Sequence, residues 1–243
     1  MHYTFTFAHR CHTICSFNSL SLLITLGLIS PAAYAARPMI TDDARITDAH
    51  TCQLESWIKN NRDSNEYWAL PACNPGGNLE LTAGGALSSD ATGSHTTALE
   101  LQAKTLLKVL EPNNWGLGLS AGTVQHPQTE ASGNVWYVNL PASFSFNDDR
   151  MVLHANLGWL NDQQYKRQNL TWGLGSETRL SELSWLIAET FGQNDETPFY
   201  QLGLRHWIAL NRIQVDMTYG NRIGSNNYEQ WFSLGLRLLS RPL

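Results

Sequence analysis

The stretch Met151–Leu160 reads MVLHANLGWL, and its apolar residues recur at every second position. His154, Asn156 and Gly158 fall on one side of the chain, whereas Leu153 and Trp159 fall on the other. Successive side chains of an extended chain point to opposite faces, so this period predicts a β-strand with one apolar and one polar face.

Four further segments repeat this alternation through the C-terminal half of the chain. They read NLTWGLG (169–175), FYQLGLRHWIAL (199–210), IQVDMTYG (213–220) and WFSLGLRLL (231–239). No segment after residue 35 has the 3.6-residue period of a helix, and counting runs between turn-forming stretches gives about twelve strands. The predicted strands begin near Cys52, Tyr67, Leu79, Thr97, Trp115, Val135, Met151, Asn169, Leu183, Phe199, Ile213 and Gln230.

The predicted connections after odd-numbered strands differ in length from those after even-numbered strands. Those after odd-numbered strands span 7 to 10 residues, and those after even-numbered strands span 2 to 5. An even strand number, with short turns at one end and longer polar loops at the other, is typical of bacterial outer-membrane proteins. The sequence therefore predicts an all-β fold, an antiparallel transmembrane β-barrel of about 12 strands in the outer membrane.

The two faces of the strands distinguish a membrane barrel from a soluble one. A membrane barrel turns apolar side chains outward to lipid and polar ones toward its lumen, whereas a soluble barrel does the reverse. Aromatic residues near strand ends match the girdles of membrane barrels. A soluble barrel with these rings in its core is the alternative. The aromatic residues are Trp115, Trp136, Phe146, Trp159, Tyr200, Tyr219 and Phe232.

Two strands fit the membrane pattern poorly. In LSWLIAETF (183–191), Trp185 and Ile187 share a face with Glu189, and a carboxylate facing lipid at mid-bilayer is unfavourable. His206 falls on the apolar face of its strand, which favours a position at a membrane interface. A bulge or a one-residue register error would account for such strands.

The N-terminus predicts export. An apolar run, LSLLITLGLI (20–29), precedes Ala33-Tyr34-Ala35, which fits a signal-peptidase site. The run is shorter than the ~20 residues of a transmembrane helix, although an uncleaved anchor is the alternative. The predicted domains are a signal peptide (1–35), a periplasmic N-terminal segment or partial plug (36–51) and the barrel (52–243).

The chain after residue 35 is acidic, with 15 basic and 21 acidic residues. An acidic chain without a basic run argues against nucleic-acid binding. The sequence contains no zinc, calcium or phosphate-binding motif, so we expect neither a metal nor a cofactor.

Cys52 and Cys73 are the two cysteines that follow the signal peptide, and an oxidising compartment favours a disulfide between them. A hairpin centred on residues 60–66 would place them almost opposite each other, close to disulfide reach. Trp57 and Trp68 would face each other in the same register. The pair lacks the spacing and further ligands of a metal or redox site, so we expect a structural role.

The string RPMITDDARITDAHTCQLES (37–56) resembles the start of mature proteins grouped as the meta-pathway phenol-degradation family. This resemblance implies an outer-membrane barrel that passes small compounds, with aromatic or hydrophobic ones as candidates. Only this first motif is specific, and a weaker likeness continues through NLELTAGGA (78–86). The cysteines are not a general feature of that family. The matching residues are Arg37, Pro38, Thr41, Asp42, Asp43, Ala44, Gln53, Leu54 and Glu55.

Asp42 and Asp43 suggest how residues 36–51 relate to the barrel. Pairing with lumen bases such as Lys59, Lys104, Arg205 or Arg237 would tether the segment as a partial plug on the periplasmic side. The alternative is that Thr41-Asp42-Asp43 caps a turn in a solvated tether.

Charged residues on the polar faces are the candidate transport site. Mixed signs would either close a narrow lumen with ion pairs or set the selectivity of an open one. The predicted lumen-lining residues are Glu55, Lys59, Glu80, Glu100, Lys104, Glu177, Arg205, Asp216 and Arg237.

Three functions are compatible with these features. The first is a passive channel or transporter for small compounds, which the resemblance favours and which is not an enzyme. The second is an outer-membrane lipid hydrolase, because His154 and Ser143 or Ser145 lie on neighbouring strands. The third is a structural or surface-interaction barrel. Expected partners are outer-membrane lipids, a small-molecule solute and the barrel-assembly machinery, although the terminal LLSRPL lacks the usual final aromatic residue.

Overall fold

The computed structural model describes residues 39–127, 133–194, 196–225 and 229–241, in which every regular element is a β-strand. The predicted signal peptide, together with Arg37 and Pro38 of the N-terminal motif, lies outside the described residues. Within the described ranges, no helix is long and apolar enough to cross a membrane. The strands are β1 (Thr51–Asn61), β2 (Asn65–Asn74), β3 (Glu80–Asp90), β4 (Gly93–Lys108), β5 (Trp115–Gln125), β6 (Asn134–Phe146), β7 (Met151–Asp162), β8 (Arg167–Arg179), β9 (Ser184–Gln193), β10 (Phe199–Ala209), β11 (Ile213–Arg222) and β12 (Trp231–Leu239).

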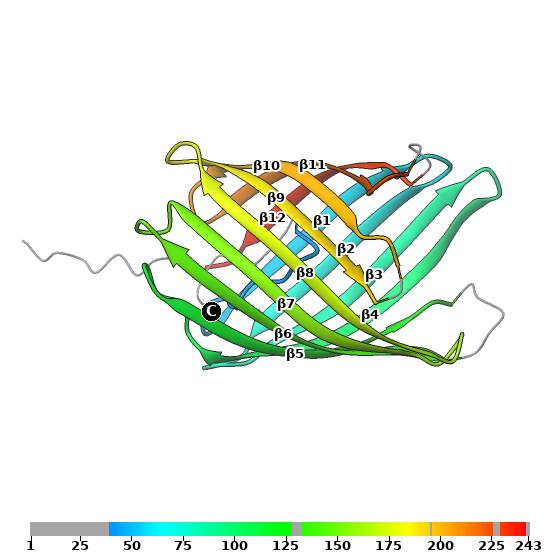
Figure 1. Ribbon diagram of the computed structural model, residues 1–243, viewed down its shortest axis with the longest axis horizontal. Coiled ribbons are helices and arrows are strands. Elements are labelled where there is room, and N and C mark those ends of the chain that lie inside the picture. The colour runs from blue at the N-terminus through cyan, green and yellow to red at the C-terminus, as the bar shows by residue number, and fades with distance from the viewer. Residues whose placement is uncertain (1–38, 128–132, 195, 226–228, 242–243) are drawn as a thin grey trace, which may run out of the picture. The chain divides into compact units, whose positions relative to one another are not determined.

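The strands form one closed antiparallel barrel (Figure 1). Each strand pairs with its neighbours in sequence, and β1 pairs with β12 from Gln53↔Leu239 to Asn61↔Trp231 to close the ring. Closure leaves no unpaired sheet edge, which a barrel in lipid requires. The predicted all-β class, strand number and antiparallel order are confirmed.

The connections are shorter than predicted after several odd-numbered strands. Residues 62–64 join β1 to β2, and residues 91–92 join β3 to β4. Polar strand ends stay extended beyond their expected limits because ladder and side-chain hydrogen bonds continue there, as between Asn60 and Asn65. Only residues 126–133 and 223–230 form long connections, so the predicted contrast in loop length is wrong for most loops.

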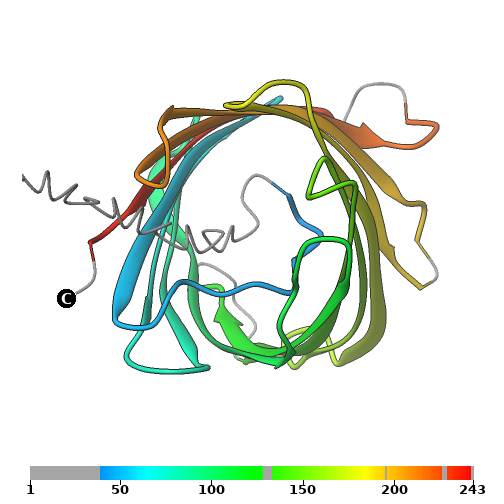
Figure 2. The ribbon, with the colours of Figure 1, turned by 90° about the vertical axis from the view of Figure 1, so that its left-hand side faces the viewer.

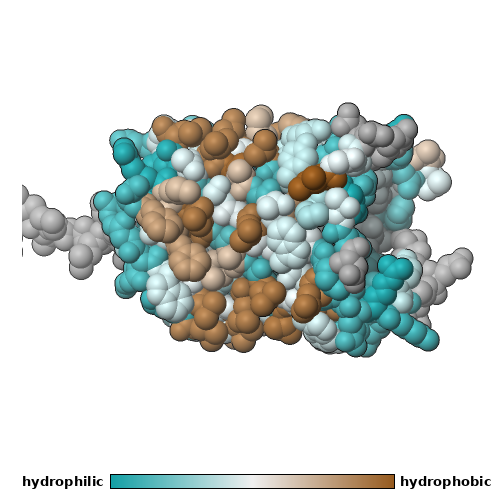
Figure 3. Space-filling model, in the orientation of Figure 1, coloured by the Kyte–Doolittle hydropathy of each residue, from teal (hydrophilic) through white to brown (hydrophobic). Residues whose placement is uncertain are grey.

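The outer surface of the barrel is apolar. Alternate residues such as Leu101, Leu157 and Leu204 are exposed, and the space-filling view shows apolar side chains over the middle of this face, with hydrophilic groups toward the ends (Figure 3). The buried residues are mostly polar or charged, so the interior is not a dry core. This arrangement contradicts a soluble barrel and has the polarity of a membrane barrel.

The strand-end aromatic residues lie on the outer surface as well. Trp115 and Phe146 are exposed near the turns after even-numbered strands, and Trp136, Trp159 and Phe232 are exposed near the opposite end. Two such groups match the aromatic girdles at the two water–lipid interfaces.

The side chains of β9 point to the opposite sides of the sheet from those that the sequence predicts. Trp185, Ile187 and Glu189 are all buried in the interior, whereas Leu186 is exposed. Glu189 therefore does not face lipid, and the lumen accommodates two apolar residues of the same face. His206 on β10 is exposed on the outer face, where its Nδ1 atom lies 2.9 Å from the Ser184 hydroxyl.

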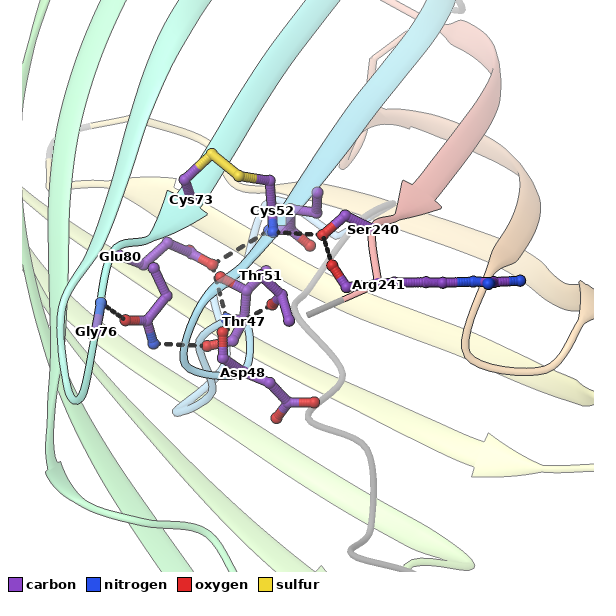
Figure 4. The surroundings of a disulfide bond; sticks show 11 residues. Thr47, Asp48, Thr51, Cys52, Cys73, Gly76, Glu80, Ser240 and Arg241 are labelled. Atoms are coloured by element: carbon purple, nitrogen blue, oxygen red, sulfur yellow. Dashed lines mark hydrogen bonds between the residues drawn. A yellow bond between two sulfur atoms is a disulfide. The ribbon is translucent and has the colours of Figure 1, made fainter. Parts of the chain in front are cut away.

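The first hairpin has the predicted register. Cys52 lies directly opposite Cys73, and Trp57 lies opposite Trp68 with stacked rings 5.1 Å apart. The cysteines form a disulfide with a Cα–Cα distance of 4.0 Å. Figure 4 shows this bond beside the place where the N-terminal segment joins β1.

Candidate functional site: the barrel lumen

The N-terminal segment, residues 39–50, runs inside the barrel as far as Thr47, and residues 48–50 are exposed before the chain continues into β1. Figure 2 looks along the barrel and shows this segment, in blue, crossing the interior. Met39, Ala44 and Ile46 are buried, and Asp43 has no exposed surface. The segment is therefore part of the lumen and not a solvated tether.

Side chains of the barrel accept hydrogen bonds from the first backbone N–H groups of this segment. The Glu189 carboxylate accepts hydrogen bonds from the N–H groups of Ile40, at 2.9 Å, and Thr41, at 2.7 Å. Asn156 binds Asp42 from both sides, because its Oδ1 accepts from the Asp42 N–H and its Nδ2 donates to the Asp42 carbonyl, each at 2.7 Å. These bonds fix the backbone of residues 40–42 across the lumen.

The following residues are held in the same manner. The Ala44 N–H donates to Ser143 Oγ, and the Thr47 N–H donates to Glu80 Oε2, each at 2.8 Å. Asn74, next to Cys73, donates to the Thr47 carbonyl. The segment thus contacts β2, β3, β6, β7 and β9. Barrel side chains accept hydrogen bonds from the N–H groups of residues 40, 41, 42, 44 and 47, whereas the Asp43 N–H donates to Asp42 Oδ1 within the segment.

Two glycines of β8 make room for the segment. A Cβ atom on Gly173 would lie 2.7 Å from Thr41 Oγ1, and one on Gly175 would lie 2.1 Å from Met39 Cε. Any larger residue at these positions would occupy space that the segment fills. The absence of side chains at these two positions of β8 is therefore required for the observed position of residues 39–41.

Asp42 and Asp43 meet Lys104 of β4. The Lys104 ammonium lies 2.6 Å from Asp42 Oδ1 and 3.3 Å from Asp43 Oδ1, and both Lys104 and Asp43 are almost fully buried. The Asp43 carboxylate also accepts from the Arg45 N–H, so a local turn accompanies the ion pair.

A second cluster of charged side chains lies in the lumen among β7, β8 and β10. Arg205 Nη1 lies 2.8 Å from Glu177 Oε1, and both side chains are buried. Arg237 of β12 donates from Nε to Gln53 Oε1 at 2.8 Å and lies 3.6 Å from Glu55. Buried charges are tolerated when they are paired and hydrogen-bonded, so these pairs fill the lumen and do not line an open bore.

The remaining predicted lumen residues lie in the interior as well. Lys59 Nζ is 4.0 Å from Glu66 and 5.0 Å from the centre of the Trp231 ring. Glu80 accepts from Thr47, as described above, and Glu100 accepts from the Tyr137 hydroxyl at 2.7 Å. Asp216 is buried beside Gly235. The structure thus gathers all nine residues inside the barrel, while their part in transport stays a prediction.

A cavity of about 690 Å³ lies above the N-terminal segment, and we call it the vestibule. Met39 to Asp42 form part of its wall, and it extends to residues near the loops after odd-numbered strands, such as Glu66 and Glu196. Aromatic side chains of the vestibule were missed by sequence reasoning because they share the lumen face with polar residues. They are Trp57, Trp68, Tyr137, Phe191, Phe199 and Trp231, and Trp172 of β8 lines the vestibule as well.

Ser143 and His154 do form the pair that the hydrolase hypothesis requires. Ser143 Oγ lies 2.8 Å from His154 Nδ1, and His154 Nε2 lies 3.7 Å from Glu177. Ser143, however, has no exposed surface, faces the lumen and already accepts the Ala44 N–H. The geometry therefore does not support a reaction with membrane lipid. No group of three or more metal-binding side chains is found among the described residues.

Solved structures similar to this chain include two porins and an outer membrane channel. A KdgM porin has a TM-score of 0.57 at 11% identity and covers 76% of this chain and 98% of its own. The NanC porin has a TM-score of 0.55 at 6% identity, with coverages of 79% and 100%. The COG4313 outer membrane channel from Pseudomonas putida F1 has a TM-score of 0.52 at 13% identity, with coverages of 87% and 98%.

At these identities the similarity shows the fold alone. No curated protein matches the sequence. The resemblance to phenol-degradation proteins is not confirmed by these comparisons and stays a prediction. The family model described as "Uncharacterised conserved protein UCP029691" matches residues 24–239, and the chain belongs to that family.

Proposed function

We propose that this protein is an outer-membrane channel for small solutes and that its own N-terminal segment, residues 39–47, closes the lumen at rest. The observation that carries this proposal is the position of that segment between the vestibule and the opposite end of the barrel. The apolar exterior supports a location in the membrane, and the porins and channel that share the fold support a channel function.

The contacts of the segment suit a removable closure. Its backbone N–H groups bind side chains of Glu189, Asn156, Ser143 and Glu80, and not the backbone ladder of the barrel. A single hydrogen bond of this kind contributes about 1 kcal/mol net, more when it involves a charged group. The segment can therefore leave the lumen without opening any strand pair.

The composition of the vestibule supports small aromatic or hydrophobic solutes. Its aromatic side chains offer flat apolar surface to a solute of similar size. A KdgM porin is known in complex with oligogalacturonate, which is a polyanion. The carboxylates of this vestibule argue against such a solute here.

Liposome swelling with the purified protein tests the proposal. We expect slow entry of small neutral solutes, including simple phenols, through the complete protein and faster entry after deletion of residues 39–47. Lys104→Met should act in the same direction, because it removes the ammonium group that lies beside Asp42 and Asp43. Lys166→Met, which removes the same charge from an exposed connection, is the matched control.

Equal swelling rates for the complete and the shortened protein would contradict the closing role of the segment. A folded, shortened protein that admits no solute at all would contradict the channel function and favour a structural or surface-interaction barrel. Folding is checked independently by the heat-dependent gel mobility of the barrel.

A further inference from the structure

The residues that line the vestibule include more acidic than basic side chains, and two of the carboxylates, Glu55 and Glu196, also lie beside Arg237 and Arg222. Two lysines line it, Lys59 and Lys104, together with six carboxylates. Lys104 is bound by Asp42 and Asp43, and Lys59 lies beside Glu66, so both cations face acidic partners already. The lining carboxylates are those of Asp42, Glu55, Glu66, Glu80, Glu100 and Glu196.

Glu100 is the acidic group best placed to meet a solute. Its carboxylate accepts a hydrogen bond from the neutral Tyr137 hydroxyl, at 2.7 Å, and lies on the vestibule wall. Tyr137 reaches it across Gly122, where a Cβ atom would lie 2.5 Å from the Tyr137 ring. The carboxyl group of Glu100 is thus held in a fixed orientation by a neutral donor.

Aromatic rings surround the same space from two sides. Trp57 and Trp68 form a stacked pair on β1 and β2. Phe191, Phe199 and Trp231 form a cluster on β9, β10 and β12, with ring centres 5.7 to 6.4 Å apart. Aromatic faces attract organic cations, and this preference grows when the site excludes water.

Two buried hydroxyl groups on the vestibule wall are left without a protein hydrogen bond. The Ser120 and Thr41 side chains are each only 1% exposed, and neither hydroxyl has a partner among the described residues. A buried hydroxyl without a partner is unfavourable, so each is satisfied by water or by a polar group of a ligand. This observation is independent of the charge and the rings.

We propose that the vestibule binds small aromatic amines in their protonated form, with the ammonium group at Glu100 and the ring against the tryptophans and phenylalanines. This inference rests on the proposed channel function only in that the site lies on the path of the solute. It narrows the solute class from aromatic compounds in general to organic monocations.

Binding to the complete protein in detergent tests this preference with three probes of similar size. We expect phenethylammonium to bind about tenfold more tightly than phenethyl alcohol, and phenylacetate to bind more weakly than either. Added salt should weaken binding of the cation and leave that of the alcohol unchanged. Equal affinities for the three probes, or tighter binding of phenylacetate, would overturn the proposal.

Substitutions locate the site. Glu100→Gln should reduce the affinity for phenethylammonium to that for the alcohol, whereas Glu182→Gln, in an exposed turn, should change neither. Trp231→Leu should weaken both probes, because it removes the ring from either. Full cation affinity in a folded Glu100→Gln protein would contradict the assignment. The salt dependence of the unaltered protein provides a test that does not depend on any variant folding.

The outcomes also separate this inference from the channel proposal. Cation preference without solute entry after deletion of residues 39–47 would leave a binding site in a protein that is not a channel. Solute entry without any charge preference would leave the channel and remove the cation site.

Discussion

Lys104 is the residue on which the position of the N-terminal segment most depends. It is the one described lysine whose ammonium lies within 4 Å of both Asp42 and Asp43, and all three side chains lie in the lumen. The Lys104 ammonium replaces water around the two carboxylates, which would otherwise be poorly solvated in the lumen. The segment therefore has its strongest single attachment at β4.

Lys104→Met should release the segment from the lumen. Removing one partner of a buried ion pair leaves an uncompensated charge and costs about 3–5 kcal/mol, which is comparable with the total contribution of the hydrogen bonds that hold residues 40–44. Trypsin then gains access to Arg45, which is only 9% exposed in the closed protein. Mass spectrometry of the product beginning at Ile46 measures this release.

The triple variant Lys104→Met/Asp42→Asn/Asp43→Asn provides the control. It removes the two acidic charges that Lys104 neutralises, at the cost of the 3.9 Å contact between Arg45 and Asp43, so cleavage after Arg45 should fall back toward the rate of the unaltered protein. Resistance to trypsin in the single variant would show that hydrogen bonds alone keep the segment in place.

Cys52 and Cys73 stabilise the same region from outside the lumen. The disulfide links residues separated by 21 positions and lies next to Thr51, whose hydroxyl donates to the Asp48 carbonyl. Closing a loop of this length contributes up to about 3 kcal/mol, and less here because the β1–β2 ladder already restrains the hairpin. Cys52→Ala/Cys73→Ala should therefore lower the urea midpoint of unfolding without changing solute selectivity. An unchanged midpoint would show that the ladder alone fixes the hairpin.

Among the elements, β8 approaches the N-terminal segment closely at two glycines. Gly173 faces Thr41, a β-branched residue with few alternative rotamers, whereas Gly175 faces the flexible end of Met39. Of the two glycines, Gly173 is thus the more sensitive position.

Gly173→Val should displace the segment while preserving the barrel. Valine is favourable in a strand, but its side chain would overlap Thr41, so the segment has to move. We expect faster liposome swelling, similar to that after deletion of residues 39–47. Ser176→Val, on the outer face of β8, should leave the rate unchanged. A Gly173→Val protein that is folded and as slow as the unaltered one would contradict this role of β8.

Strand order and the first hairpin could be predicted from sequence, because the two-residue period and the Cys52/Cys73 spacing are local signals. The face of β9 could not. The rule that apolar residues point outward fails for Trp185 and Ile187, because this lumen is filled and buries apolar as well as polar groups. The barrel partners of residues 40–44 also lie 61 to 149 positions away, and no periodicity reports such contacts.

At the scale of the whole molecule, the barrel separates two kinds of surface. The outside is apolar and suits lipid, while the inside holds paired charges, the N-terminal segment and the vestibule. A wall one strand thick thus separates the side chains that face the lumen from those that face lipid. The same wall predicts how stability depends on the depth of an outer residue.

Arginine substitutions on the outer face should therefore differ in effect according to their position along β10. Leu204 lies near the middle of the strand and Leu210 lies in the turn that follows it, and both are exposed on the described surface. In a bilayer, Leu204→Arg should destabilise the folded protein by about 2–4 kcal/mol and Leu210→Arg by about 0–1 kcal/mol, because the penalty falls toward the interface. Urea titrations of folding into lipid vesicles measure the difference. Equal effects at the two positions would mean that this face of the barrel is not immersed in lipid, since water would then solvate both arginines alike.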